Sequence, residues 1–252
     1  MQKAFLKIDE GSFEITLASI DQLIVEVHIA WKQERTLRLV TFNPEMLLEA
    51  IRNPNFAESI RSAQILLPDG IGLVFLLRKL TKYPKIERIA GIELAWKMLQ
   101  TAAESGKKIA LLGSSQESLK GTIAKIKREL PDMDIVYGHH GYFTEAEQED
   151  ILNDLRSSKP DLILVAMPFT HQEPLIAILQ SRLERGVMLG IGGSFDVWSG
   201  RVKRAPALLR SLNLEWLWRL ISQPHRTKRI LGMLWEFVPL FWKLSTKEKN
   251  FT

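Results

Sequence analysis

The stretch TFNPEMLLEAIRNPNFAESIRSAQILLPDGIGL, residues 41–73, is the clearest indication of the fold. It contains two polar turns, Thr41–Pro44 and Pro68–Gly70, and each turn follows a short apolar run. These runs are Leu37–Val40 and Ile65–Leu67. Short apolar runs that end in Pro or Gly are typical of buried strands with polar exits. The stretch therefore predicts two buried strands joined by helical chain.

Three polar side chains follow these two strands. Ligands of an open α/β sheet bind at the carboxyl ends of its strands. We therefore expect the Thr41 hydroxyl, the Asn43 amide and the Asp69 carboxylate to lie at one edge of the sheet. A hydroxyl, an amide and a carboxylate together suit sugar chemistry.

Strands and helices alternate through the rest of the first two hundred residues. We expect further strands at Lys108–Leu112, Asp134–Tyr137, Leu162–Ala166 and Val187–Ile191. The helices expected between strands are Pro44–Ile51, Gly70–Leu80, Ile92–Glu104, Glu117–Leu130, Thr144–Ser157 and His171–Arg185. Two short strands, Ala4–Ile8 and Phe13–Leu17, and a helix from about Ile20 to Glu34 precede them. Repeated βα units predict an α/β fold with a mostly parallel sheet and helices on both faces.

The pattern changes at Pro206. Two helices, Leu208–Ile221 and Pro224–Leu244, are expected, and no strand pattern follows. The predicted organisation is a core of residues 1–205 and a C-terminal helical appendage of residues 206–252.

Charge and tryptophan are concentrated in this appendage. Residues 200–252 hold 11 Lys and Arg against 3 Asp and Glu, while the whole chain has a net charge of +5, which leaves residues 1–199 at −3. Five of the seven Trp also fall late, at positions 198, 216, 218, 235 and 242. A basic, Trp-rich segment on a nearly neutral body predicts an anionic partner for that segment.

Three arginines of the appendage, Arg219, Arg226 and Arg229, have two interpretations. They can form a solvated helix face, or they can bind a diphosphate or anionic lipid headgroups through the planar guanidinium. The neighbouring Trp and Leu favour a helix at a membrane surface. Nucleic acid is not expected as the partner, because binding DNA or RNA does not explain so large an apolar content. No apolar run reaches the roughly 18 residues that cross a membrane, and the absence of Cys fits a reducing compartment.

Asp69 also has two interpretations. It follows a strand and opens a helix, where Asp is a preferred N-cap. Alternatively, it is a general base on a sugar hydroxyl, since a helix N-terminus favours the ionised carboxylate. Thr41 and Asn43 can bind a sugar or simply form a turn before Pro44.

Two glycine turns are candidate phosphate sites. Gly113-Ser114-Ser115 and Gly190-Ile191-Gly192-Gly193-Ser194 each end a predicted strand. Their backbone N–H groups can meet a nucleotide, or the glycines can serve close packing. Neither turn has the spacing of a dinucleotide-binding or Walker motif. Metal binding is not expected, because adjacent His139 and His140 in a strand point to opposite faces.

With these residues in place, the chain resembles the WecG/TagA/CpsF glycosyltransferases of bacterial polymer synthesis. The resemblance runs from about residue 40 to 230. It rests on the motifs TFNPEML (41–47), LLPDGIGLV (66–74), RIAGIEL (88–94), HQE (171–173), GIGGSFDVWSGRVKRAP (190–206) and LEWLWRLISQPHRTKRI (214–230).

The resemblance implies an inverting transferase with a Rossmann-like core and no cofactor or essential metal. Such enzymes move N-acetylmannosamine, its uronic acid or another hexose from a UDP-sugar to an undecaprenyl-diphosphate-linked sugar. They are cytoplasmic and peripheral at the inner face of the plasma membrane. The resemblance implicates Asp69 as catalytic base, Thr41, Asn43 and Gln172 in substrate binding, and Arg219, Arg226 and Arg229 at the lipid diphosphate and membrane. The other candidate substrate-binding residues are Arg88 and, from the two glycine turns, Gly113, Gly192 and Gly193.

Two other functions are also compatible with the sequence. One is a non-enzymatic nucleotide-binding or membrane-adaptor protein of the same fold, which would bind UDP without transferring a sugar. The other is a nucleic-acid binder, which would show a steep salt dependence with oligonucleotide. The apolar C-terminal segment can also be covered by a sister subunit in a homo-oligomer.

Overall fold

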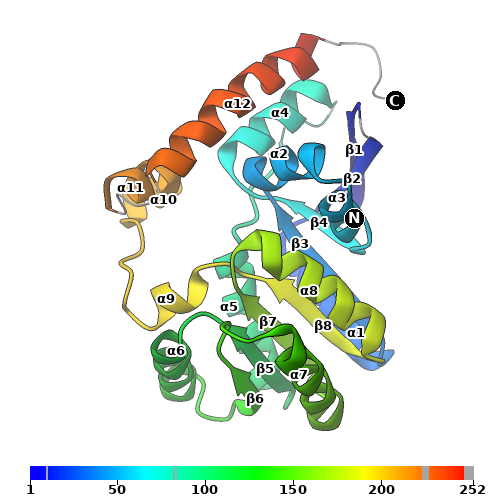
Figure 1. The fold of residues 1–252 in the computed structure, drawn as a ribbon, viewed down its shortest axis with the longest axis vertical. Coiled ribbons are helices and arrows are strands. Elements are labelled where there is room, and N and C mark those ends of the chain that lie inside the picture. The colour runs from blue at the N-terminus through cyan, green and yellow to red at the C-terminus, as the bar shows by residue number, and fades with distance from the viewer. Residues whose placement is uncertain (10, 82, 84, 223–226, 247–252) are drawn as a thin grey trace.

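The computed structural model describes residues 1–9, 11–81, 83, 85–222 and 227–246. Within them, a six-stranded parallel sheet has the strand order β4-β3-β8-β7-β5-β6 (Figure 1). Its strands are β3 (Thr36–Phe42), β4 (Ile65–Pro68), β5 (Lys108–Gly113), β6 (Asp134–His139), β7 (Leu162–Ala166) and β8 (Gly186–Gly190). The strands β1 (Gln2–Ile8) and β2 (Gly11–Leu17) form a separate antiparallel hairpin. The predicted α/β fold with a parallel sheet is confirmed.

Helices cover both faces of this sheet. The helices of the described residues are α1 (Ile20–Lys32), α2 (Pro44–Arg52), α3 (Pro54–Arg61), α4 (Ile71–Leu80), α5 (Gly91–Glu104), α6 (Gln116–Glu129), α7 (Glu145–Ser158), α8 (Phe169–Arg182), α9 (Ser194–Trp198), α10 (Ala207–Ser211), α11 (Glu215–Ser222) and α12 (Thr227–Thr246). One face packs against α1 and α5, and the other against α7 and α8. A third apolar cluster joins the hairpin, α2, α3, α4 and α12.

Strand β3 shows why the sheet forms here. Leu37 and Leu39 pack on the α1 and α5 side, whereas Val40 and Phe42 pack on the opposite face. Alternate residues of a strand point to opposite faces, so an almost continuous apolar run lets both faces be covered. Arg38, in the middle of this run, is fully buried, and its charge must therefore be compensated inside the protein.

Several predicted elements are extended or divided in the structure. Helix α3, absent from the prediction, begins at Pro54 because Asn53 accepts a hydrogen bond from the Phe56 N–H at 3.1 Å. The predicted helix Leu208–Ile221 is wrong as a single element, because the chain breaks between α10 and α11 at Asn213, which has φ +58°. The expected start of the last helix at Pro224 lies outside the described residues.

The two adjacent histidines also differ from expectation. The ring centroids of His139 and His140 lie 4.5 Å apart, so the prediction that they point to opposite faces is wrong. The reason is that β6 ends at His139, and the strand alternation stops there. The described residues nevertheless contain no group of three or more His, Asp or Glu arranged to hold a metal ion.

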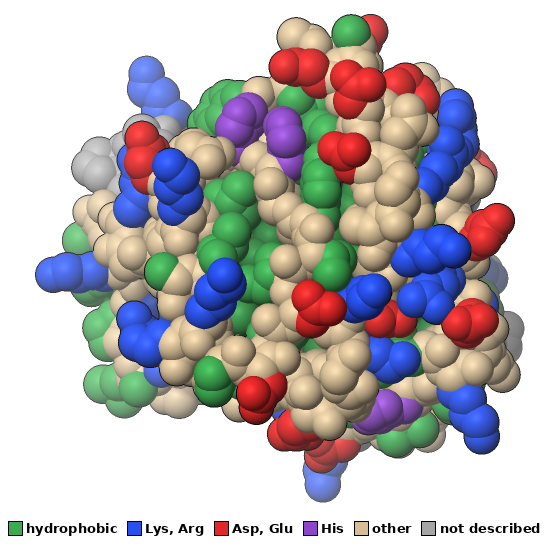
Figure 2. Space-filling model, turned by 90° about the horizontal axis from the view of Figure 1, so that it is seen from below, with side chains coloured by type: hydrophobic (Ala, Val, Ile, Leu, Met, Phe, Trp, Pro, Cys, Tyr) green, Lys and Arg blue, Asp and Glu red, His purple; other side chains and the backbone are tan. Residues whose placement is uncertain are grey.

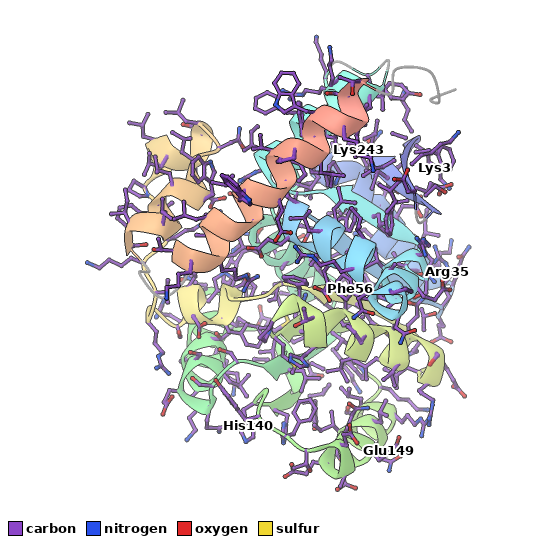
Figure 3. The ribbon with its side chains drawn as sticks, turned by 45° about the horizontal axis from the view of Figure 1, so that its top comes forward. Lys3, Arg35, Phe56, His140, Glu149 and Lys243 are labelled. Carbon is purple, nitrogen blue, oxygen red and sulfur yellow. The ribbon has the colours of Figure 1, made fainter. Side chains whose placement is uncertain are left out.

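Helix α12 packs on the core through one of its faces. Phe237 and Leu244 are 5% and 6% exposed and join the cluster formed by α2 and α4. Phe237 fits where Gly72 has no side chain, since a Cβ there would lie 2.9 Å from its ring. At the other end of α12, Lys243 reaches the β1–β2 hairpin and pairs with Asp9 at 2.7 Å (Figure 3).

The opposite face of α12 is apolar and exposed. Leu231, Trp235, Val238 and Trp242 are 52%, 83%, 49% and 64% exposed. Their spacing of four, three and four residues places them on one side of a helix. No helix in the described ranges has both the length and the apolar character that crossing a bilayer requires.

Candidate active site at the carboxyl edge of the sheet

The Asp69 segment extends the pairing between β3 and β4 by one residue. The Asp69 N–H donates to the Phe42 carbonyl at 2.8 Å, and on the other side of β4 the Ile89 N–H donates to the Pro68 carbonyl at 2.9 Å. The chain before α5 is thereby held beside the end of β4. Asp69 itself is half-buried.

The carboxylate of Asp69 is oriented by the turn that follows it. Its Oδ1 accepts a hydrogen bond from the Gly70 N–H at 2.7 Å. The N-cap of α4 is Gly70, which has φ +77° and makes no side-chain cap. The interpretation of Asp69 as an N-cap is therefore wrong, because Asp69 lies one position before the cap. It remains close to the positive end of α4, which favours its ionised form.

Thr41 and Asn43 lie next to this turn. A Cβ on Gly70 would lie 3.1 Å from Pro44 Cδ and 3.9 Å from Asn43 Cβ. Thr41, which is 7% exposed, faces the start of α5, where a Cβ on Gly91 would lie 3.0 Å from its Oγ1. The ends of β3 and β4 and the start of α5 thus converge, although their residues are up to fifty positions apart.

Asn43 also has a structural task. It is the N-cap of α2, and its Oδ1 accepts from the Met46 N–H at 3.1 Å. Asn43 thus has a structural role as a helix cap, and its role in sugar binding stays a prediction. The cap fixes the orientation of the Asn43 side chain, whose Cβ lies beside the Gly70 turn.

A second part of the edge lies where the chain leaves β5 and β7 in opposite directions along the sheet, toward β6 and β8. Such a switch point is the usual ligand crevice of an open α/β sheet. Gly113 ends β5 with φ +119°, and a Cβ there would lie 2.3 Å from the Ala166 carbonyl. Close packing against β7 therefore requires this glycine.

Asp196 of α9 is a further polar residue at this point that the sequence motifs did not indicate. Its Oδ1 accepts hydrogen bonds from Ser114 Oγ at 2.8 Å and from Ser118 Oγ at 2.6 Å.

The turn after β8 rests on Gln172. The Gln172 side chain is 1% exposed, and its Oε1 accepts from the Gly192 N–H at 2.8 Å. A Cβ on Gly190 would lie 2.1 Å from Gln172 Nε2, so this glycine permits the close approach. Gly192 has φ +52° with open space beside it, and Gly193 is the N-cap of α9. The structure places Gln172 beneath the turn.

Arg88 connects the core to the C-terminal helices. Its Nη1 pairs with Glu215 Oε2 of α11 at 2.8 Å, and both side chains are largely buried. Arg204 pairs with Glu93 at 2.5 Å and lies 3.8 Å from Glu215, and Arg210 lies 3.7 Å from Glu93. An open groove of about 530 Å³ runs between α4 and α10 and is lined in part by Ile71, Arg78, Arg88, Glu93 and Arg210.

Arg229 reaches the same edge from α12. It forms an ion pair with Glu45 of α2 and lies over the Phe169 ring at 5.3 Å from its centroid. Its side chain is 52% exposed. Arg219 is described as part of α11 but not by its side chain, and Arg226 lies outside the described residues.

One carboxyl group beside the switch point has a perturbed pKa. The hydrogen bond from Ser115 and the guanidinium of Arg201 lower the pKa of Glu117 on α6. Arg201 Nη1 lies 2.8 Å from Ser115 Oγ and 2.7 Å from Glu117 Oε2. This contact ties the chain after α9 to the start of α6.

Comparison with known proteins identifies the family. The sequence model of the glycosyl transferase WecG/TagA/CpsF family matches residues 9–250. The chain belongs to this family. A relative from Bacillus spizizenii is 36% identical over 201 residues, which cover 80% of this chain and 77% of the relative. One from Staphylococcus aureus is 32% identical over 246 residues, 97% and 94% of the two chains. Both are named N-acetylglucosaminyldiphosphoundecaprenol N-acetyl-beta-D-mannosaminyltransferase.

The resemblance stated from the sequence motifs is therefore confirmed, and this WecG/TagA/CpsF member is a glycosyltransferase by family. The polar residues predicted from its motifs are distributed along one sheet edge. Asp69, Thr41 and Asn43 gather at β3 and β4, whereas Gly113, Gln172 and the 190–193 turn follow β5, β7 and β8.

Proposed function

We propose that this protein transfers a hexosyl group from a UDP-sugar to a polyprenyl-diphosphate-linked sugar, with inversion at the anomeric carbon. The observation that carries the proposal is the convergence of Asp69, Thr41 and Asn43 at one edge of the sheet. The names of the relatives support N-acetylmannosamine as donor sugar and an undecaprenyl-diphosphate-linked N-acetylglucosamine as acceptor. The uronic acid of N-acetylmannosamine and other hexoses are the alternative donors.

Asp69 acts as general base in this scheme. As the acceptor oxygen bonds to the anomeric carbon, the bond from that carbon to the UDP oxygen breaks, and the electron pair leaves with UDP. The acceptor proton passes to the Asp69 carboxylate. An aspartate carboxylate is a weak base, so in this scheme proton transfer comes late, after the new bond has begun to form. General-base assistance contributes about 10²–10⁴-fold in rate.

The leaving UDP requires positive charge or N–H dipoles. Arg88 and Arg229 are two described cations at this edge, and we propose them for this role. The turns at Gly113 and at Gly192–Gly193 supply the corresponding dipoles, through N–H groups other than that of Gly192, which already donates to Gln172 Oε1. Arg219 and Arg226 complete the proposed cation set at the lipid diphosphate. Thr41 and Asn43 bind the sugar.

The C-terminal segment, residues 206–252, is proposed to dock on the inner face of the plasma membrane, with residues 1–205 as the catalytic core. The exposed stripe of Leu231, Trp235, Val238 and Trp242 supports this role, because Trp and aliphatic residues on one helix face suit a bilayer interface. By contrast, acidic and basic side chains are interspersed around a hydrophobic strip on the face seen in Figure 2. This face does not suit the phosphate backbone of a nucleic acid. For the basic C-terminal segment, the apolar stripe of α12 favours a membrane surface instead.

A panel of UDP-sugars with a short-chain lipid-diphosphate-sugar acceptor tests the proposal. We expect a disaccharide-lipid product and released UDP for one donor. A protein that binds UDP in calorimetry but yields product with none of the donors would instead be the non-enzymatic adaptor. Sedimentation with and without anionic vesicles separates membrane docking from a homo-oligomer that covers the same stripe.

A further inference from the structure

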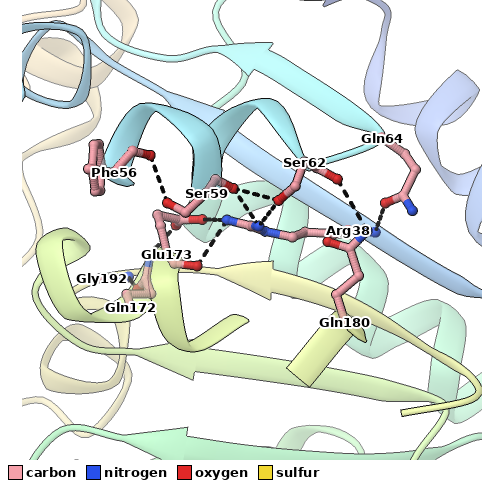
Figure 4. A network of polar contacts seen from close by, with 9 residues as sticks. All are labelled: Arg38, Phe56, Ser59, Ser62, Gln64, Gln172, Glu173, Gln180 and Gly192. Carbon is pink, nitrogen blue, oxygen red and sulfur yellow. Dashed lines mark hydrogen bonds and ion pairs between the residues drawn. The ribbon is translucent and has the colours of Figure 1, made fainter. Parts of the chain in front are cut away.

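A chain of buried polar contacts crosses the protein beneath the turn that follows β8 (Figure 4). Arg38 of β3 and Glu173 of α8 form an ion pair at 2.9 Å, and their side chains are 0% and 1% exposed. Glu173 Oε1 accepts from Gln172 Nε2 at 2.7 Å, and Gln172 Oε1 accepts from the Gly192 N–H at 2.8 Å. The contacts thus run without a break from the middle of the sheet to the turn.

The other end of this chain is fixed by helix α3. Arg38 Nη1 donates to the Ser59 carbonyl at 2.6 Å and to Ser62 Oγ at 3.1 Å. Its Nη2 donates to the Glu173 backbone carbonyl at 3.0 Å as well as to the carboxylate. The Arg38 guanidinium therefore donates to four acceptor atoms, and these hydrogen bonds fix its position.

Stability alone does not account for this pair. Removing two charges from water is costly, and replacing a buried ion pair with apolar residues of similar size is often neutral or stabilising. Arg38 Nε is also buried without a hydrogen-bond partner among the described residues. Because burial of this ion pair is costly, we explain its presence by the positions that it imposes on neighbouring side chains.

We propose that Arg38 and Glu173 are positioning residues for donor binding. The ion pair fixes the Glu173 carboxylate, the carboxylate holds the Gln172 amide in one orientation, and the amide oxygen holds the Gly192 N–H. The turn at residues 190–193 is thereby fixed before the nucleotide arrives. This inference rests on the proposed function in one respect, that the turn binds the UDP portion of the donor.

The packing of Gly190 supports this assignment. A Cβ on Gly190 would lie 2.1 Å from Gln172 Nε2 and 2.5 Å from Glu173 Oε1. The two side chains therefore fill the space at the end of β8, where the strand turns. A shift of either side chain moves the start of the 190–193 turn, and misplacement of about 1 Å can cost about 10²-fold in rate.

The double variant Arg38→Met/Glu173→Leu tests the proposal, because it removes both buried charges together. We expect it to fold with a melting temperature within a few degrees of wild type. The Kd for UDP and the KM for the donor should rise about tenfold or more, whereas the KM for the acceptor stays within about twofold. Glu173→Gln, which keeps the side-chain shape, should show the same division between donor and acceptor.

The matched control is Gln180→Met on the same helix. Gln180 Nε2 donates to the Ser62 carbonyl at 3.2 Å and has no contact with Gln172 in Figure 4. This variant should leave the donor KM and the acceptor KM unchanged. A readout independent of activity is hydrogen exchange at the Gly192 amide, which should be at least about tenfold faster in the double variant and unchanged in Gln180→Met.

Three results would overturn the proposal. The first is a folded double variant with wild-type UDP affinity and wild-type exchange at Gly192. The second is failure of both the double variant and Glu173→Gln to fold, which would make the pair a requirement for stability. The third is an equal rise in both KM values together with a lowered melting temperature. If wild-type protein binds no UDP, the proposed function fails, while the exchange measurement still tests the positioning.

Discussion

The sheet and the last helix are held in different ways. The central strands of the sheet are packed by side chains that are almost completely buried, and the ion pair between Arg38 of β3 and Glu173 of α8 is buried as well. Helix α12 is attached by a few buried apolar residues, among them Phe237 and Leu244, and by exposed ion pairs. These pairs are Arg229–Glu45, Arg52–Glu236 and Lys243–Asp9.

This difference separates the contacts that stabilise the sheet from those that attach α12 to the core. Buried contacts are little affected by salt, whereas exposed ion pairs are screened and contribute little. Helix α12 therefore depends mainly on its inward apolar residues for attachment, whereas its outward apolar residues are half to largely exposed. The outward residues are available for a surface outside the protein, as the proposed docking requires.

The largest effect is expected at the sheet edge. Asp69→Asn should lower turnover by at least about 10², the low end of general-base contributions, while UDP affinity persists. The measurement is steady-state transfer together with calorimetric titration of UDP. Asp21→Asn, which alters an acid in the first turn of α1, is the control and should retain activity. Near-normal turnover in Asp69→Asn would rule out the base.

The next largest effect is a difference in the free energy of unfolding between variants on the two faces of α12. Phe237→Ala should lower the free energy of unfolding by at least about 2 kcal/mol, since it removes a buried ring. Trp235→Ala, on the exposed face, should change it by no more than about 0.5 kcal/mol. Urea denaturation of both variants measures the difference. Equal losses in the two variants would mean that the faces are not distinct in solution.

A smaller effect is expected at the membrane. The double variant Trp235→Ala/Trp242→Ala should weaken binding to anionic vesicles about tenfold, because two interfacial aromatic residues are lost. Its turnover with a short-chain soluble acceptor should be unchanged. Co-sedimentation with vesicles is the measurement, and binding equal to that of wild type would show that this stripe faces something other than lipid.

The smallest effect is expected from the ion pairs of α12. Arg52→Gln, which breaks the contact with Glu236, should cost less than about 1 kcal/mol. The cost should decline as salt is raised, because the pair is exposed and screened. Urea denaturation at low and high salt is the measurement. A loss above about 2 kcal/mol that persists at high salt would place this ion pair among the contacts that hold the fold.

The sequence predicted what depends on neighbouring residues. The strands follow from short apolar runs, and α1 and α7 begin close to the expected positions, where Ser19 and Thr144 form capping boxes. The edge position of Asp69 and Asn43 also follows from local pattern, since both come directly after a strand in a parallel sheet.

What the sequence did not predict depends on distant partners. Arg38 inside an apolar run indicates a buried charge, but its partner Glu173 lies 135 positions later. Likewise, Gly72 receives Phe237 across most of the chain. Periodicity and capping describe one segment at a time, so they cannot identify such pairs.

The configuration of the product is the most direct test of the central claim, a single displacement assisted by Asp69. The measurement is the anomeric configuration of the transferred sugar, read by NMR from the product of an α-linked UDP-sugar donor. A single displacement with inversion should give a β-linked product. An α-linked product would show retention and would contradict displacement by the acceptor in one step.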